Sequence, residues 1–112
     1  MKKLEIVVRP EKVSLLKAIF NENNVGGVMF TKITGYGNQK GKEYEYKGMR
    51  YFDNMLSKTK AETVVADDVA EKLISQILDE IPTGEHGDGK IFVYEVNEVV
   101  RIRTGERNEE AL

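Results

Sequence analysis

A short glycine-rich segment carries the clearest chemical signal in this sequence. Residues 83–90 read Thr-Gly-Glu-His-Gly-Asp-Gly-Lys, so three glycines fall within six residues and a lysine closes the segment. Glycine allows a tight turn whose backbone N–H groups converge on an anion, and the lysine adds a positive charge at its edge. The segment therefore indicates a phosphate-binding turn, although a glycine-rich turn before a strand is more often only a connection.

Two arginines follow a few residues later. Arg101 and Arg103 are two positions apart, so in an extended segment both guanidinium groups would point from the same face. Such a face suits a polyphosphate, whereas paired arginines more often belong to a solvated edge. Because the glycine-rich turn and the arginines occur close together with no acidic run between them, we favour a phosphate-binding interpretation.

The composition excludes several other kinds of site. The 112 residues include no cysteine and one histidine, His86, which excludes disulfides, zinc thiolate sites, histidine metal clusters and most catalytic triads. A formal net charge of -2 argues against nucleic-acid binding. No apolar run approaches the ~20 residues that a membrane span needs, so we expect no membrane insertion. We expect a single domain over residues 1–112 of a cytoplasmic protein.

Hydrophobic periodicity predicts four strands and two helices. The strands are predicted at 3–9, about 28–37, 59–66 and 90–97, and the helices at 10–23 and 67–81. This order is that of an α+β, ferredoxin-like split βαβ fold, with both helices on one face of a four-stranded sheet. The other face also carries apolar residues, so we expect self-association to cover it.

Finer features are predicted at the ends of these elements. Asp67 and Asp68 are expected to cap the second helix, with Glu71 completing a capping box. A short further strand is predicted at 99–103. The polar tail from residue 105 onward is expected to be mobile.

The stretch from about 37 to 57 fits neither pattern. Tyr44, Tyr46, Tyr51 and Phe52 are interleaved there with charged residues. A stretch of ~20 residues without regular structure is rare in a compact domain unless it has a function. Because tyrosine combines contact area with a hydrogen-bonding group, we favour a partner-binding loop over an inert extension. The alternation of tyrosines also allows a marginal hairpin arm.

Several blocks of the sequence together match the motifs of one known family. They lie at 9–12, 35–41 and 46–48, at Tyr51 and Lys58, and at 83–93 and 100–106. The last two blocks are highly specific when they occur together in this order. Over essentially its whole length the chain resembles the PII nitrogen-regulatory signal-transduction proteins.

The resemblance implies a regulator rather than an enzyme. It implies a homotrimer that binds ATP or ADP, with Mg²⁺ accompanying ATP, in each of three clefts between neighbouring subunits. The protruding loop at about 37–57 would contact a target, either a membrane transporter such as the ammonium transporter or an enzyme of nitrogen metabolism. A transporter would recruit the protein to the membrane. The further ligand implied is 2-oxoglutarate.

The resemblance also assigns residues to these ligands. The nucleotide-binding residues would be Gly35, Gly37, Asn38, Gln39, Val64, Gly87, Asp88, Gly89, Lys90, Arg101 and Arg103. Those for 2-oxoglutarate would be Gln39, Lys40, Gly41 and Lys58, with Gln39 also holding Mg²⁺. Target contacts would come from Tyr44, Tyr46, Lys47, Arg50, Tyr51 and Phe52, and Tyr51 matches a nucleotidylation site of some members. The phosphate-binding turn spans 83–90, and the C-terminal segment spans 102–112.

Some positions depart from the family pattern. Asn38 stands where an arginine is usual, Ser57 replaces a proline beside Lys58, and Arg50 replaces a glutamate before Tyr51. These changes support an alternative, a divergent PII-like adenylate sensor that regulates a different transporter without responding to 2-oxoglutarate.

Two unrelated classes share the order of elements. An enzyme of acylphosphatase type needs a glycine-rich loop where this chain has only Arg9-Pro10. An RNA-recognition domain needs exposed aromatic residues on its central strands and a basic surface, but the first predicted strand has no aromatic residue. Neither class fits the sequence.

Overall fold

The computed structural model describes residues 1–37, 43–52 and 55–112, and for residues 43–46 and 50–52 it describes the backbone alone. The strands are β1 (Lys2–Val8), β2 (Met29–Tyr36), β3 (Glu43–Tyr46), β4 (Met49–Phe52), β5 (Met55–Val65) and β6 (Lys90–Glu95). The α-helices are α1 (Val13–Glu22) and α2 (Asp67–Glu80), and short 3₁₀ helices span Pro10–Lys12 and Asn108–Ala111. No helix in the described ranges has both the length and the apolar character that a membrane crossing requires.

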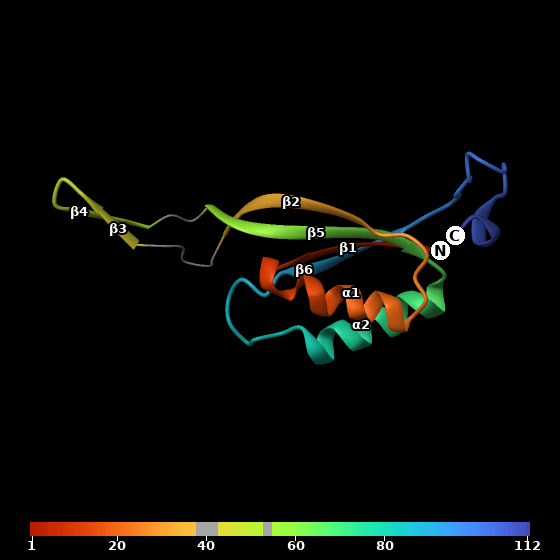
Figure 1. The fold of residues 1–112 in the computed structure, drawn as a ribbon, viewed down its shortest axis with the longest axis horizontal. Helices are drawn as coiled ribbons and strands as arrows, with labels where there is room; N and C mark the ends of the chain where they lie inside the picture. Colours follow the sequence, from red (N-terminus) through yellow and green to blue (C-terminus); the bar gives the residue numbers. More distant parts are fainter. Residues whose placement is uncertain (38–42, 53–54) are drawn as a thin grey trace.

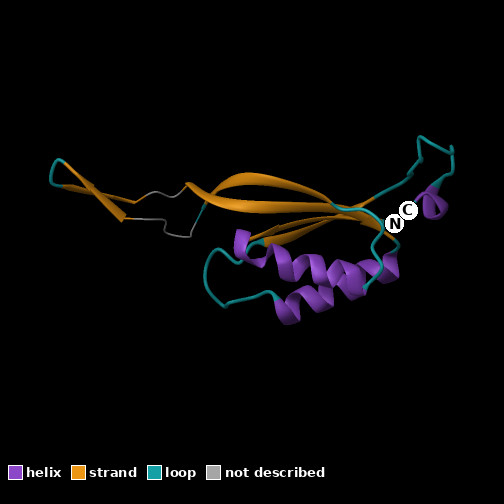
Figure 2. Ribbon diagram, in the orientation of Figure 1, coloured by secondary structure: helices purple, strands orange, loops and turns teal. Residues whose placement is uncertain are grey.

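The main sheet has the strand order β2-β5-β1-β6, and every neighbouring pair is antiparallel (Figure 1). Leu4 in the central strand β1 lies opposite Thr63 of β5 and Val93 of β6. Both helices cover the same face of this sheet (Figure 2). The predicted α+β, ferredoxin-like fold is therefore confirmed.

The core lies between the helices and one face of the sheet. Alternate residues of β1, namely Leu4, Ile6 and Val8, are buried there, as a strand with one covered face requires. The helices contribute apolar residues at helical spacing. These are Leu16, Ile19 and Phe20 from α1, and Ala70, Leu73 and Ile77 from α2. Burial of these side chains holds the sheet and helices in one unit and fixes which strand ends lie together.

The opposite face of the sheet, here called the open face, mixes rings with paired charges. The Lys3 ammonium lies 3.2 Å from a Glu62 carboxylate oxygen and 3.3 Å from one of Glu5. The Tyr94 hydroxyl donates to Glu5 over 3.1 Å. Phe92 and Tyr94 are both 46% exposed. Self-association through this face stays a prediction.

The loop predicted at 37–57 contains a hairpin, which the alternating tyrosines allowed for. Strands β3 and β4 pair antiparallel, and they project from the end of β2 and β5 away from the body (Figure 1). Lys47 and Gly48 form the turn between them with φ of 52° and 78°. Two successive positive φ values are typical of the tight turns that match the twist of a hairpin. Strand β5 also begins earlier than predicted, at Met55.

Predictions about element ends were wrong in two places. Helix α2 begins at Asp67 with Ala66 as its N-cap, and no side chain caps it; Asp67 instead lies 2.9 Å from the Met1 amino group. Residues 99–103 form no strand, because Val100 makes a single bridge to Arg107 and a turn follows at once. The polar tail contains the 3₁₀ helix Asn108–Ala111, and its mobility stays a prediction.

Candidate functional site

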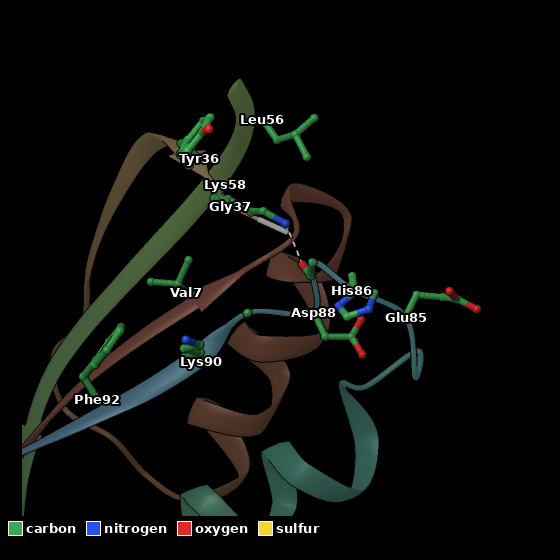
Figure 3. A pocket seen from close by; sticks show the side chains of 13 residues that line it. Val7, Tyr36, Gly37, Leu56, Lys58, Glu85, His86, Asp88, Lys90 and Phe92 are labelled. Carbon is green, nitrogen blue, oxygen red and sulfur yellow. Dashed lines mark hydrogen bonds between the residues drawn. The ribbon is translucent and has the colours of Figure 1, made fainter. Parts of the chain in front are cut away.

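A pocket of about 590 Å³ lies at the end of the sheet where β5 and β6 begin (Figure 3). The β1 and β2 ends and the turn after α2 complete its walls. It is lined by Val7, Gly35, Tyr36, Gly37, Leu56, Lys58, Glu85, His86, Gly87, Asp88, Gly89, Lys90 and Phe92. Antiparallel pairing brings these strand ends together, so residues that are far apart in the sequence share one cavity.

The glycine-rich turn, residues 83–89, is organised by its own carboxylate. Asp88 accepts hydrogen bonds from the Thr83 hydroxyl over 2.5 Å, and from the Thr83 and Gly84 backbone N–H groups over 2.9 Å each. The Arg9 guanidinium adds a contact of 3.3 Å. The Thr83 hydroxyl, the two backbone donors and Arg9 lower the pKa of Asp88 to about 2, against a smaller opposing effect of desolvation. Asp88 is therefore an ionised brace for the turn at neutral pH.

Glycine is required where this turn meets β1. Gly87 and Gly89 have φ of 101° and 99°, a region that other residues rarely adopt. A Cβ atom added at Gly89 would lie 1.6 Å from the carbonyl oxygen of Val7. The turn can lie against the β1 backbone only because residue 89 has no side chain.

Two lysines bring positive charge to the pocket. The Lys58 ammonium donates to the Gly87 carbonyl oxygen over 2.6 Å (Figure 3). Burial lowers the pKa of Lys58, and the neighbouring Arg9 charge adds to this effect. Lys90 lines another wall, at the start of β6. Ammonium groups beside a glycine-rich turn form a donor set suited to an anion such as phosphate or carboxylate.

The structure brings only part of the sequence-predicted site together. Gly35, Gly37, Lys58 and residues 87–90 all line the pocket. Val64 lies six residues beyond Lys58 along β5, roughly 20 Å away at the usual rise of a strand. Asn38, Gln39, Lys40 and Gly41 lie outside the described residues.

Arg101 and Arg103 lie at the other end of β6. That strand leads away from the pocket to the end of the molecule where both chain termini lie, and the C-terminal segment follows it there (Figure 1). Arg101 pairs with Glu106 over 2.7 Å, and Gly105 donates its N–H to the Arg101 carbonyl over 2.8 Å. The expected extended segment with both guanidiniums on one face is wrong, because residues 102–104 form a turn. Within one chain these arginines do not line the pocket.

The residues assigned to target contact lie on the hairpin. Its register places Tyr44 opposite Tyr51 and Arg50 opposite Glu45, while Tyr46 and Phe52 end their strands. Lys47 is exposed at the turn. The hairpin thus holds all six of these residues beyond the pocket.

Sequence reasoning missed several residues that build this site. Arg9 lies in the matching block 9–12 but received no ligand role, yet it contacts the turn through Asp88 and through the His86 carbonyl oxygen at 2.8 Å. Val7 and Phe92 line the pocket because they lie on the open face, as Lys90 does. The alternation of each strand was the signal that could have placed these two.

Comparisons with known proteins agree with this geometry. The family model "Nitrogen regulatory protein P-II" matches residues 1–106. The chain is 41% identical to the nitrogen regulatory protein P-II of Pyropia yezoensis, 41% identical to that of Pasteurella multocida and 43% identical to that of Rhizobium meliloti. Each alignment spans 112 residues and covers 100% of both chains. The chain therefore belongs to the nitrogen regulatory protein P-II family, whose members are signal-transduction regulators and not enzymes.

Proposed function

We propose that this protein binds ATP and ADP in clefts between copies of the chain, and that its loop controls a target protein in response. The target would be an ammonium transporter or an enzyme of nitrogen metabolism. The observation that carries the proposal is that the cationic residues are divided between the two ends of β6. One chain places the turn, Lys58 and Lys90 around a pocket, while Arg101 and Arg103 follow the far end of β6.

The pocket has the chemistry to hold phosphate groups. The Lys58 and Lys90 ammonium groups supply charge, and the glycines of the turn allow a ligand to approach the backbone closely. Apolar side chains on the remaining walls would limit the access of water to the phosphates. These features support a polyphosphate ligand better than a neutral one.

A neighbouring copy would complete the site. Arg103 is exposed, and the segment that carries it is ordered by contacts within itself. In a closed ring of copies each interface joins two different surfaces, so the far end of one chain can reach the pocket of the next. The partly apolar open face would be covered at the same time. A homotrimer with three such clefts fits this arrangement.

The pocket is also placed to influence the loop. Gly37 and Leu56 line it, and they stand at the two ends of the segment that leads to and from the hairpin. A ligand in the pocket would therefore contact both ends of this segment. Only ~1–3 kcal/mol of coupling between the two sites is needed for a useful switch.

Mg²⁺ and 2-oxoglutarate belong to the finer part of the proposal. Lys58 already points its ammonium into the pocket, where a ligand carboxylate could reach it. Gln39 would hold Mg²⁺ together with the ligand oxygens, and Lys40 and Gly41 would contact 2-oxoglutarate. With 2-oxoglutarate bound, the loop would report nitrogen status.

A second candidate is an adenylate sensor that does not respond to 2-oxoglutarate and regulates a different transporter. It is favoured by the substitutions next to the ligand residues, Asn38 and Ser57. Ser57 lies within β5 opposite Thr34, and unlike a proline it keeps its backbone N–H. The strand can therefore continue past this position toward the loop.

Isothermal titration separates the candidates. The protein is titrated with ATP and with ADP, each with Mg²⁺, and the ATP titration is repeated with 2-oxoglutarate. Binding of 2-oxoglutarate only in the presence of ATP supports the nitrogen sensor. Binding of nucleotides alone supports the adenylate sensor. Failure of both nucleotides to bind contradicts the proposed function.

A further inference from the structure

We propose that Arg9 is a positioning residue that holds the turn 83–89 in the shape that receives phosphate. The inference rests on the proposed function, because it concerns the same pocket. Arg9 follows the end of β1 directly and precedes the 3₁₀ helix Pro10–Lys12. It thus joins the turn to the β1–α1 junction, which is 77–79 residues away in the sequence.

Arg9 contacts the turn at two points. Its Nη2 donates to the His86 carbonyl oxygen over 2.8 Å, and its Nε donates to the Asp88 carboxylate over 3.3 Å. The side chains of this pair are only 16% and 23% exposed, so solvent weakens their attraction less than at an open surface. A guanidinium suits this bridge because it presents several donors in a fixed plane.

These contacts lie on both sides of a glycine of the turn. Gly87 lies between His86 and Asp88, and glycine adopts positive or negative φ with similar ease. Arg9 holds the residue on each side of it, while Lys58 holds the Gly87 carbonyl oxygen itself. Two cations from neighbouring strands thus restrain consecutive carbonyl groups, which would repel an anion if they faced it unpaired.

Arg9 acts through the turn rather than on the ligand. It is not among the described residues that line the pocket, whereas all of residues 85–90 are. Removing Arg9 would leave the ligand-facing groups in place but would loosen the backbone that orients them. Orienting partners of this kind typically change affinity by 10–100-fold in metal sites, and we expect about tenfold here.

The test uses the full chain with Arg9→Gln, Arg9→Lys and the control Lys17→Gln. Lys17 is a cation of α1 that lies over the Phe30 ring, so the control removes one charge away from the pocket. The dissociation constant for ATP is measured by calorimetry. Amide hydrogen exchange of residues 83–89 is measured without nucleotide.

We expect Arg9→Gln to speed exchange in the turn and to weaken ATP binding about tenfold. Arg9→Lys keeps the charge but loses the planar group, so it should fall between Arg9→Gln and the wild type. Lys17→Gln should match the wild type. If Arg9→Gln fails to fold, the inference is tested by comparing the amide exchange and the ATP affinity of Arg9→Lys with those of the wild type.

Two results would overturn the inference alone. One is unchanged exchange in the turn of the Arg9 variants, and the other is a loosened turn that still binds ATP as the wild type does. Wild-type affinity and an unchanged turn in Arg9→Lys alone would overturn the part of the inference that requires the planar guanidinium. Failure of the wild-type protein itself to bind ATP would refute the proposed function, and this inference with it.

Discussion

The segments at the two ends of β6 differ in what holds them in shape. Before β6, the turn 83–89 is held by its own Asp88 and also by other parts of the chain, through Arg9 at the end of β1 and Lys58 on β5. After β6, residues 99–107 are held mainly by each other, through the Arg101–Glu106 pair and the bridge from Val100 to Arg107. The first segment is built into the domain, and the second is a small unit on its surface.

This difference bears on what each segment can do alone. The turn already faces a pocket, whereas the C-terminal segment points side chains outward. Ile102 at its turn is 100% exposed, so this apolar side chain is accessible to a neighbouring copy. This difference supports the proposal that a single chain supplies one half of a nucleotide site and a neighbouring copy supplies the other half.

The largest expected effect is a difference in stability between two glycine substitutions, one in each segment. Gly89→Ala places a Cβ against the Val7 carbonyl oxygen at a φ of 99°, so we expect the free energy of unfolding to fall by about 3 kcal/mol or more. Gly105→Ala has open space at a φ of 73° and should cost about 1 kcal/mol. Urea unfolding of both variants measures this. Equal losses would contradict the account of the turn as part of the domain.

Arg103→Ala tests the function assigned to the second segment. We expect it to weaken ATP binding by about 1.5–3 kcal/mol, the value of a charge-assisted hydrogen bond, without lowering the unfolding midpoint. Arg107→Ala is the control from the same segment, since it removes an arginine that pairs with Glu98 instead. Calorimetry measures both affinities. An affinity unchanged by Arg103→Ala would remove this residue from the site.

A smaller effect, whose pH dependence is confined to acid, is expected from Asp88→Asn. The pKa of Asp88 falls from 3.8 to about 2 on folding, so its ionised form contributes stability above its unfolded pKa, and that contribution is lost as pH falls toward 2. The variant lacks this contribution. Its free energy of unfolding should therefore change less than that of the wild type between about pH 4 and 2, as measured by urea unfolding across that range. Parallel curves would show that Asp88 does not brace the turn.

The smallest effect is expected from Glu106→Gln. It removes the charge opposite Arg101 on an accessible surface, where such a pair contributes about 0–1 kcal/mol. The loss should shrink further as salt is added, because ions screen exposed charges. Thermal unfolding at low and high salt measures it. A loss well above this range would mean that the C-terminal segment supports the whole domain.

Local patterns predicted most of the fold. The spacing of Leu16, Ile19 and Phe20 indicated α1, and the alternation of Leu4, Ile6 and Val8 indicated β1, because each pattern matches the geometry of its element. The cap of α2 was mispredicted because Asp67 contacts the Met1 amino group, which sequence spacing cannot reveal. The strand predicted at 99–103 failed because that segment pairs only within itself.

The site residues likewise divide into those that local sequence predicts and those that depend on the tertiary structure. Gly87, Gly89 and Lys90 were predictable because a turn depends on neighbouring residues. Arg9 was not, since its contacts depend on the order of the strands. The position of Arg103 away from the pocket was also beyond local reasoning, because it depends on the length and direction of β6.

The most direct test of the shared cleft is to mix two defective variants. Lys90→Ala damages the pocket side, Arg103→Ala damages the far side, and the two chains are co-expressed with different tags and purified as mixed assemblies. If each site uses both copies, every mixed trimer has intact residues at one site in three, and calorimetry detects that fraction binding ATP with wild-type affinity. If no sites of wild-type affinity return, each site uses residues of a single chain and the account is wrong.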